Sequence, residues 1–399
     1  MSERASMAAL ATLLAALAMI GPFAIDTYLP AFPAIERDLI VSPVQMQQTL
    51  SLYLVAFAVM TLFHGTLSDS FGRRPVVLAN IAAFALASLG CTLAASFEQL
   101  LVFRALQGAS AGAGIVVGRA IIRDSFEGHA AQRLMSLVTM IFGLAPAIAP
   151  VIGGMLQQAL GWRAVFGFLV SYSVALLVAC HWLLDETLPH AQRQPFRLRP
   201  LARNYWTLGR SIPLFLISSA IAFNFAGFFL YILSAPAFVY DVLGLSAADF
   251  PWLFMPGIIG VMSGAYVSGR VAGRMTQPQI VTLAYAIMFA AAAFNVVYSA
   301  AAPAALPWSV LPIMIYTFGM ALAMPTLTLL ALDLFPQNRG LAASLMGFEH
   351  SFVSALAAGA LSPMVSHSAL TLAAGMTGLA TVGWIAWRLY RHKQSILNA

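Results

Sequence analysis

A short polar turn, Gly65-Thr66-Leu67-Ser68-Asp69-Ser70-Phe71-Gly72-Arg73-Arg74-Pro75, joins two long apolar runs. The runs cover about residues 45–66 and 75–95. Each is long enough to cross the ~30 Å hydrocarbon core of a bilayer, which takes roughly 20 apolar residues in a helix. The stretch therefore predicts two membrane-spanning helices joined by a tight basic turn on one side of the membrane.

The composition of the whole chain agrees with this prediction. Of the 399 residues, 61% are hydrophobic and only 9% are charged, whereas soluble domains have roughly 45–50% and 25%. This excludes a soluble globular domain, a disordered chain and a nucleic-acid-binding protein. The net charge of +6 comes from basic residues in short loops between apolar runs. The two cysteines, Cys91 and Cys180, lie inside apolar runs, so they indicate neither a disulfide framework nor a metal site.

Twelve apolar runs of spanning length follow one another along the chain. They lack the alternating pattern of a membrane β-barrel, so the predicted fold is an all-α polytopic membrane protein. The expected spans are 7–30, 45–66, 75–95, 98–120, 133–157, 163–184, 213–240, 249–272, 279–299, 308–332, 341–364 and 368–390.

The basic residues predict the orientation of these spans. With twelve spans, all 20 Lys and Arg residues except Arg37, Arg104 and Arg163 fall in loops or ends on one side. Cytoplasmic loops are the ones enriched in Lys and Arg, so both termini are expected in the cytoplasm.

The longest loop divides the spans into two sets of six. It covers 185–212, contains three prolines and five arginines, and predicts a cytoplasmic linker between halves 1–184 and 213–399. The Gly72-Arg73 pair recurs as Gly273-Arg274 after the eighth span, which indicates a weak internal repeat. Many secondary transporters consist of two such halves, with the substrate site near the midplane between them.

Three ionisable residues lie inside predicted spans, where each costs at least ~2.5–3.5 kcal/mol and is therefore a functional candidate. Asp26 lies between Pro22 and Pro30, which predict a kink in the first span. Arg104 lies at a compatible depth in the fourth span, so the two side chains are candidates for a pair. That pair either couples transport to protons or locks two helices together. The third residue is Glu349.

Glu349, in the eleventh span, has three readings: a second titrating site, a substrate contact, or a packing bond with His350. Asn224, in the seventh span, occupies a position similar to that of Asp26 in the repeat and is its candidate uncharged counterpart. No spacing typical of metal ligands or of a nucleotide-binding loop occurs. The other candidates for lining a substrate cavity are Tyr28, Tyr53, Phe57, Phe142, Phe225, Phe228, Tyr231 and Met320.

Over nearly its whole length the chain resembles the major facilitator superfamily. The turn at 65–75 is similar to the superfamily's loop between its second and third helices, which implies a conformational latch. Physically, Asp69 is placed to cap a helix or to pair with Arg123. The latch candidates are Gly65, Asp69, Gly72, Arg73, Arg74 and Arg123.

Two further spans carry the resemblance. Residues 101–108, with Arg104, resemble the motif in which an intramembrane arginine modulates proton transfer. The fifth span resembles the motif associated with antiporters, in which Gly and Pro permit a bend and close helix packing. The residues of that motif are Gly143, Pro146, Pro150, Gly153 and Gly154.

Residues 25–33, 119–124 and 162–163 resemble the Bcr/CflA drug-resistance transporters. This resemblance implies a monomeric exporter in the bacterial inner membrane that exchanges amphenicol- or bicyclomycin-type drugs for protons. It further implies that Asp26 is the proton-linked acid, and it implies no cofactor and no enzymatic activity. The alternatives are an exporter of an endogenous metabolite such as an amino acid or nucleoside, a proton-driven importer, and a membrane enzyme or sensor.

Overall fold

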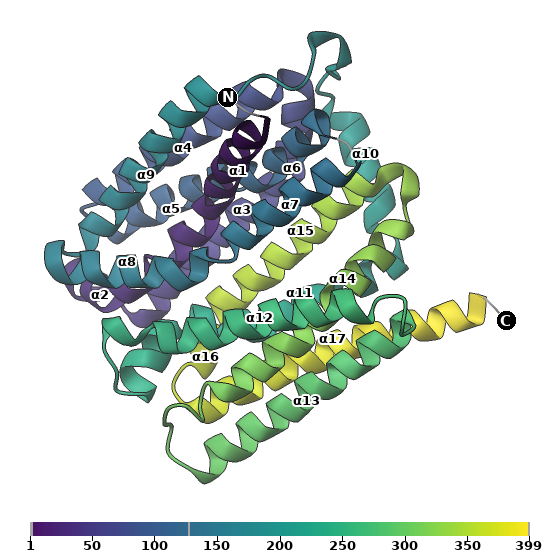
Figure 1. Cartoon of the computed structure of the whole chain (residues 1–399). Helices are drawn as coiled ribbons and strands as arrows, with labels where there is room; N and C mark the ends of the chain where they lie inside the picture. Colours follow the sequence, from purple (N-terminus) through teal and green to yellow (C-terminus); the bar gives the residue numbers. More distant parts are fainter. Residues whose placement is uncertain (1–2, 127, 398–399) are drawn as a thin grey trace. The chain divides into compact units, whose positions relative to one another are not determined.

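The computed structural model describes residues 3–126 and 128–397. Twelve helical segments in this part of the chain are long and apolar enough to cross a membrane, which confirms the predicted all-α fold with twelve spans. The chain divides into two compact units, residues 1–198 and 199–399. Figure 1 colours the first unit from purple to teal and the second from teal to yellow.

The first unit contains the first six spans, several of which are split into two helices. Its helices are α1 (Glu3–Asp26), α2 (Phe32–Leu39), α3 (Pro43–Phe71), α4 (Arg73–Leu93), α5 (Phe97–Ala111), α6 (Ala113–Ser125), α7 (Gly128–Phe142), α8 (Ala145–Leu160) and α9 (Trp162–Leu183). α3 packs on α5 and α4 packs on α9, while α1 packs on α6, α7 and α8.

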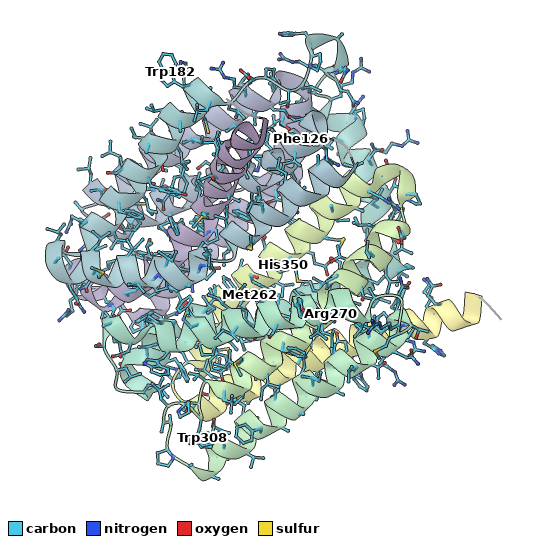
Figure 2. All side chains as sticks on the ribbon, viewed as in Figure 1. Phe126, Trp182, Met262, Arg270, Trp308 and His350 are labelled. Atoms are coloured by element: carbon cyan, nitrogen blue, oxygen red, sulfur yellow. The ribbon has the colours of Figure 1, made fainter. Side chains whose placement is uncertain are left out.

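The second unit begins with a linker helix and contains the other six spans. Its helices are α10 (Leu198–Gly209), α11 (Ile212–Leu233), α12 (Pro251–Val271), α13 (Gln277–Ala301), α14 (Leu311–Asp333), α15 (Arg339–Leu356), α16 (Ser362–Val365) and α17 (Ala369–Leu397). α14 packs on α12 and α13, and α11 packs on α17, α15 and α14. Arg270, in the last turn of α12, and Met262, two turns earlier, are labelled in Figure 2.

Prolines account for two helix breaks inside the predicted spans. A proline ring clashes with the carbonyl four residues earlier and ends the helix there. Pro30 lies four residues after Asp26, where α1 ends, and Pro146 lies four residues after Phe142, where α7 ends. The kink predicted near Asp26 is a full break between α1 and the following 3₁₀ turn, whereas α1 continues through Pro22. The fifth predicted span, 133–157, is likewise divided between α7 and α8.

Helix caps and one glycine turn define other boundaries. Ser42 begins α3 with a capping box to Gln45, and Ser96 caps α5 by accepting a hydrogen bond from the Gln99 backbone. Gly72, between α3 and α4, has a φ of 101°, a conformation that side-chain-bearing residues rarely adopt. The basic turn predicted from the sequence is therefore a single residue wide.

Candidate functional site

The candidate proton-coupling acid, Asp26, lies at the last residue of α1. A 3₁₀ turn, Leu29–Ala31, follows the break. The Asp26 side chain is only 4% exposed. The next residue, Thr27, donates its hydroxyl to the Phe23 carbonyl at 2.6 Å and so closes the helix end. Asp26 is thus an acidic group buried at a point where the helix is already broken.

The guanidinium of Arg104, on α5, is fully buried among groups from three helices. Its Nη1 donates to the Ala24 carbonyl at 3.0 Å and to Gln107 Oε1 at 2.8 Å. The Tyr28 and Tyr53 rings lie 4.6 and 4.5 Å from its central carbon. Nε and Nη2 have no hydrogen-bond partner among the described residues. The two aromatic faces stabilise the positive charge by cation–π contact.

The expected ion pair between Asp26 and Arg104 is not formed in this conformation. None of the ion pairs made by the described residues includes either of them. The reason is that Arg104 reaches α1 at the carbonyl of Ala24 rather than at the Asp26 carboxyl.

Gln107 belongs to this site, although it is not among the residues predicted from the sequence. It accepts from Arg104, and its Nε2 donates to Ser88 Oγ on α4 at 2.8 Å. The Cys91 thiol lies 3.6 Å from the same Gln107 oxygen. The sequence feature that could have indicated Gln107 is its position: a long polar side chain one helical turn after the charged Arg104 in an apolar span.

The antiporter-type helix packs directly beside Asp26. Gly153 of α8 is buried, and a methyl group there would overlap the backbone carbonyl of Thr27. Glycine is therefore required for α8 to approach this turn of the chain. Gly154 and Pro150 are also buried in α8, Pro146 lies in its first turn, and Gly143 lies in the break before it.

The latch residues form ion pairs, but not all of the expected ones. Arg73 is 6% exposed and binds the carboxylates of Asp69 and, at 2.8 Å, Asp124. The pairing of Asp69 with Arg123 is therefore wrong, because Asp69 is one turn before Arg73 on the same face. Arg123 is exposed, while the adjacent Asp124 points toward Arg73.

A glutamate after α9 caps the helix that begins at the latch. Glu186 accepts hydrogen bonds from the backbone N–H groups of Arg73 at 3.0 Å and Arg74 at 3.3 Å. A carboxylate is stabilised at a helix N-terminus by these unsatisfied donors. A side chain at Gly72 would overlap this carboxylate. Glycine is therefore required at position 72 for two reasons: its positive φ and the nearby Glu186 side chain. Gly65 has only ordinary contact with Val116.

In the second unit, Glu349 and His350 on α15 both contact α11. Ser219 Oγ donates to Glu349 Oε1 at 2.5 Å, and the His350 ring lies 4.3 Å from the Phe225 ring. His350 is labelled in Figure 2. The packing bond expected between Glu349 and His350 themselves is replaced by these contacts with α11, because consecutive helix residues do not face each other.

Asn224 lies inside the second unit. It is 2% exposed, and its Nδ2 donates to the Tyr285 hydroxyl at 2.9 Å, while the Tyr316 hydroxyl donates to its backbone carbonyl at 3.0 Å. These bonds join α11 to α13 and α14. In this conformation Asn224 contacts helix partners rather than an open space.

The other cavity candidates fall into separate groups. Tyr28 and Tyr53 surround Arg104, and Phe57 stacks on Tyr53. Phe142 ends α7. In the second unit, Phe225 and Phe228 are in edge contact, whereas Tyr231 (1% exposed) and Met320 (4%) are buried.

The sequence model of the Major Facilitator Superfamily matches residues 11–358. The chain belongs to the major facilitator superfamily. The superfamily assignment also fits the twelve spans and the apolar surface of the helices, and it makes the protein a membrane transporter of small molecules. The family predicted from the loop at 65–75 is confirmed.

Relatives of this chain within the superfamily include drug-resistance transporters. The chain is 32% identical, over 68% of its length and 69% of the relative's, to a bicyclomycin resistance protein homolog of Haemophilus influenzae. It is 31% identical to YdgK of Bacillus subtilis, an uncharacterised transporter of the superfamily, over 95% and 94% of the two chains. It is 30% identical to a chloramphenicol resistance protein of Pseudomonas aeruginosa, over 73% and 68%. These relatives confirm the predicted Bcr/CflA-type resemblance.

Two solved structures of transporters share the fold. The human organic anion transporter MFSD10 aligns over 96% of this chain and 99% of its own with a TM-score of 0.69 and 18% identity. An inward-facing bacterial homologue of the human lysosomal transporter Spinster aligns over 97% and 96% with a TM-score of 0.70 and 16% identity.

Proposed function

We propose that this chain exports drug-like small molecules from the cytoplasm in exchange for protons, by alternating access. Among its relatives are proteins named for resistance to bicyclomycin, to chloramphenicol and to multiple drugs. Amphenicol- and bicyclomycin-type antibiotics are therefore the first substrates to test. The proposal places the protein in a bacterial cytoplasmic membrane, with both termini in the cytoplasm, as a monomer without a cofactor or enzymatic activity.

The observation that carries the proton step is the position of Asp26. Its carboxyl group is buried in a span, forms none of the ion pairs of the described chain and lies at a helix break packed against Gly153. In this conformation the carboxyl group can take up or lose a proton without a salt bridge being broken. Because the helix is already broken at this point, the end of α1 can move when Asp26 gains or loses a proton without disrupting an intact helix.

Arg104 is proposed as the partner that holds Asp26 in its charged state. Its Nε and Nη2 groups are buried without hydrogen-bond partners, which is costly for a cation. A carboxylate is the group that best satisfies these donors. We expect the deprotonated Asp26 to approach Arg104 in another step of the cycle, and protonation to release it.

One proton supplies enough energy for useful export. At ~150 mV, inward movement of one charge releases about 3.5 kcal/mol, which supports a gradient of a few hundredfold for a neutral substrate. In the proposed cycle, the two halves and their linker rearrange, while the Arg73 ion pairs act as the latch.

Proton release on substrate addition tests the proposal. Purified protein in weak buffer near neutral pH receives chloramphenicol, bicyclomycin or a panel of amino acids and nucleosides. Substrate-dependent release that is lost in Asp26→Asn supports competition between proton and drug. Asp333→Asn, which removes one side of an exposed ion pair, is the matched control and should keep the signal.

Three results would change the assignment. Normal proton release by Asp26→Asn would exclude Asp26 as the proton site. Release with one polar metabolite and with no drug would identify a metabolite exporter instead. Binding without any release would argue against antiport.

A further inference from the structure

The first unit contains a buried histidine that the proposed proton step does not use. His64 lies on α3, eight residues before the turn at Gly72, which places it about 12 Å along the helix from the latch. The residue is fully buried, and none of the ion pairs in residues 3–126 and 128–397 includes it. It is therefore an ionisable group inside a span, where such groups are costly.

The hydrogen bonds around His64 determine which ring nitrogen carries the hydrogen. Asn80, on α4, donates from Nδ2 to the Val76 carbonyl at 2.8 Å, so its Oδ1 is directed at the histidine. His64 Nε2 lies 3.1 Å from that oxygen, which can only accept, so Nε2 bears the hydrogen and donates it. In the neutral ring, Nδ1 then has a lone pair and no hydrogen.

Nδ1 of His64 faces the junction between α5 and α6. This nitrogen is buried and completes no hydrogen bond with the described residues. A methyl group added at Gly112, the residue between the two helices, would lie 3.3 Å from it. The Ala109 carbonyl, on the last turn of α5, borders the same ring. A proton bound at Nδ1 therefore breaks no existing hydrogen bond and has a carbonyl acceptor on α5.

The charged groups on the helices around α3 provide His64 with no counter-ion in this conformation. The helices packed against α3 are α2, α4, α5 and α6. The charged side chains on α3 and on these four helices are Glu36, Arg37, Asp38, Asp69, Arg73, Arg74, Glu98, Arg104, Arg119, Arg123 and Asp124. A charged imidazole would thus depend on backbone carbonyls and on water, so its charge favours a state in which the latch side is open to water.

Phe57 links the surroundings of Arg104 with those of His64. Its ring stacks on Tyr53, whose face covers Arg104. The same Phe57 ring and His64 both lie within 3.4 Å of a methyl group added at Gly112. The Arg104 cluster and the histidine are therefore two polar sites along one set of packed helices, with an apolar ring beside both. In this conformation the ring blocks proton transfer between them, because it offers the proton no acceptor.

We infer that His64 is the proton acceptor on the cytoplasmic side of the transport cycle. This inference rests on the proposed function. When the latch side, which is expected to be cytoplasmic, opens to water, the Asp26 carboxylic acid gives up its proton and Nδ1 of His64 accepts it. The imidazolium then releases the proton to cytoplasmic water, which returns Asp26 to the carboxylate and His64 to the neutral ring. Imidazole suits this step because it gains and loses a proton at about pH 5–8.

Nitrogen NMR of the ring tests the inference without any transport measurement. Full-length protein with isotope-labelled histidine is purified in detergent, and the His64 signals are those missing from His64→Gln. We expect Nδ1 to be bare at high pH and to gain a proton between about pH 8 and pH 5, while Nε2 keeps its hydrogen throughout. A ring that stays neutral over this range, or a neutral ring with its hydrogen on Nδ1, would overturn the inference.

Transport by His64→Gln separates a proton role from a structural one. Glutamine can donate to Asn80 Oδ1 as Nε2 does, but it takes up no proton. In inverted vesicles we expect this variant to lower chloramphenicol accumulation driven by a pH gradient by about tenfold or more. Exchange of labelled for unlabelled chloramphenicol at equal pH needs no net proton movement and should stay close to wild type. His181→Gln, at an exposed position near the end of α9, is the matched control and should keep both activities.

The outcomes also separate this inference from the proposed function. Normal gradient-driven accumulation by His64→Gln, or an equal loss of accumulation and exchange, would overturn the role of the histidine and leave the exporter intact. An equal loss with a lower melting temperature would make His64 a packing residue, and His64→Asn, with a smaller amide, is measured beside it in case glutamine does not fit. Absence of gradient-driven transport by the wild type would instead overturn the proposed function, and this step with it.

Discussion

At the scale of single residues, the charge of the buried Arg104 accounts for the two tyrosine rings that cover it. A guanidinium inside a span needs both hydrogen-bond acceptors and a polarisable environment. Ala24 and Gln107 provide the acceptors, and the faces of Tyr28 and Tyr53 cover the flat sides of the group. Arginine and lysine are not equivalent here, because an ammonium group is compact and cannot lie flat between two rings.

Arg104→Lys should therefore lower proton-coupled export by about tenfold or more, since it removes the stacked, charge-assisted contacts while keeping the charge. The measurement is drug uptake into inverted vesicles under an imposed pH gradient, corrected for protein amount. Arg270→Lys is the matched control, because Arg270 lies over the exposed Tyr266 ring, where such contacts contribute little. Equal activity of wild type and Arg104→Lys would show that charge alone is sufficient.

Sequence alone identified the two charged residues of this site but not its contacts. Asp26 and Arg104 were predictable because ionisable groups are rare in spans and each is costly. The hydrogen-bond partner of Arg104 on α1 was not predictable, because carboxyl and carbonyl oxygens of neighbouring residues on a helix lie only a few ångströms apart. Glu186 was missed for a similar reason: it is far from Arg73 in sequence, and only the fold brings it to the start of α4.

At the scale of helices, glycines on α5, α6 and α8 determine how closely the backbones approach. Methyl groups at Gly108, Gly114 and Gly153 would overlap the backbone carbonyls of Tyr53, Leu17 and Thr27, respectively. A backbone carbonyl cannot rotate away as a flexible side chain can, so a larger residue must separate the helices.

Gly153→Ala should destabilise the protein by about 1–3 kcal/mol, the usual cost of overpacking a tight contact, and should reduce export. The reason is that α8 would be pushed away from the turn that carries Asp26. Thermal unfolding in detergent and drug transport are the two measurements.

Gly167→Ala is the control for this prediction, because Gly167 lies on α9 with no atom within 4 Å of the added methyl group. Replacement there should preserve or slightly raise stability, since alanine favours helix more than glycine. If Gly153→Ala unfolds at the wild-type temperature and transports normally, the close approach of α8 is not needed for coupling.

The existence of the helices, and a distortion of the first and fifth, were predictable from the sequence, but whether a proline bends a helix or ends it was not. The twelve apolar runs gave the twelve spans, because length and hydropathy decide whether a segment crosses a bilayer. The interruptions after Asp26 and Phe142 depend on whether a proline bends a helix or ends it. Pro256 and Pro325 lie inside α12 and α14, which continue through them, so the presence of proline alone does not decide the outcome.

At the scale of the whole molecule, the distribution of basic residues predicts which ends of the helices face the cytoplasm. The linker between the two units carries arginines, whereas the loop between α13 and α14 has no charged residue from Ala302 to Val310. By the positive-inside rule we expect the linker in the cytoplasm and the α13–α14 loop on the opposite side of the membrane.

Single cysteines at exposed positions of the second unit should report this orientation directly. Arg199, in α10, and Ala305, in the α13–α14 loop, are both exposed, so each accepts a cysteine without loss of packing. The two native cysteines, Cys91 and Cys180, are fully buried, so the wild-type protein is the low-background control. A membrane-impermeant maleimide applied to intact spheroplasts should label Ala305→Cys but should label Arg199→Cys only after permeabilisation.

The reverse pattern would place the arginine-rich linker outside the cytoplasm. That result would also invert the direction of transport, because in the proposed cycle Asp26, near the end of the first span opposite the N-terminus, takes up its proton from the periplasm.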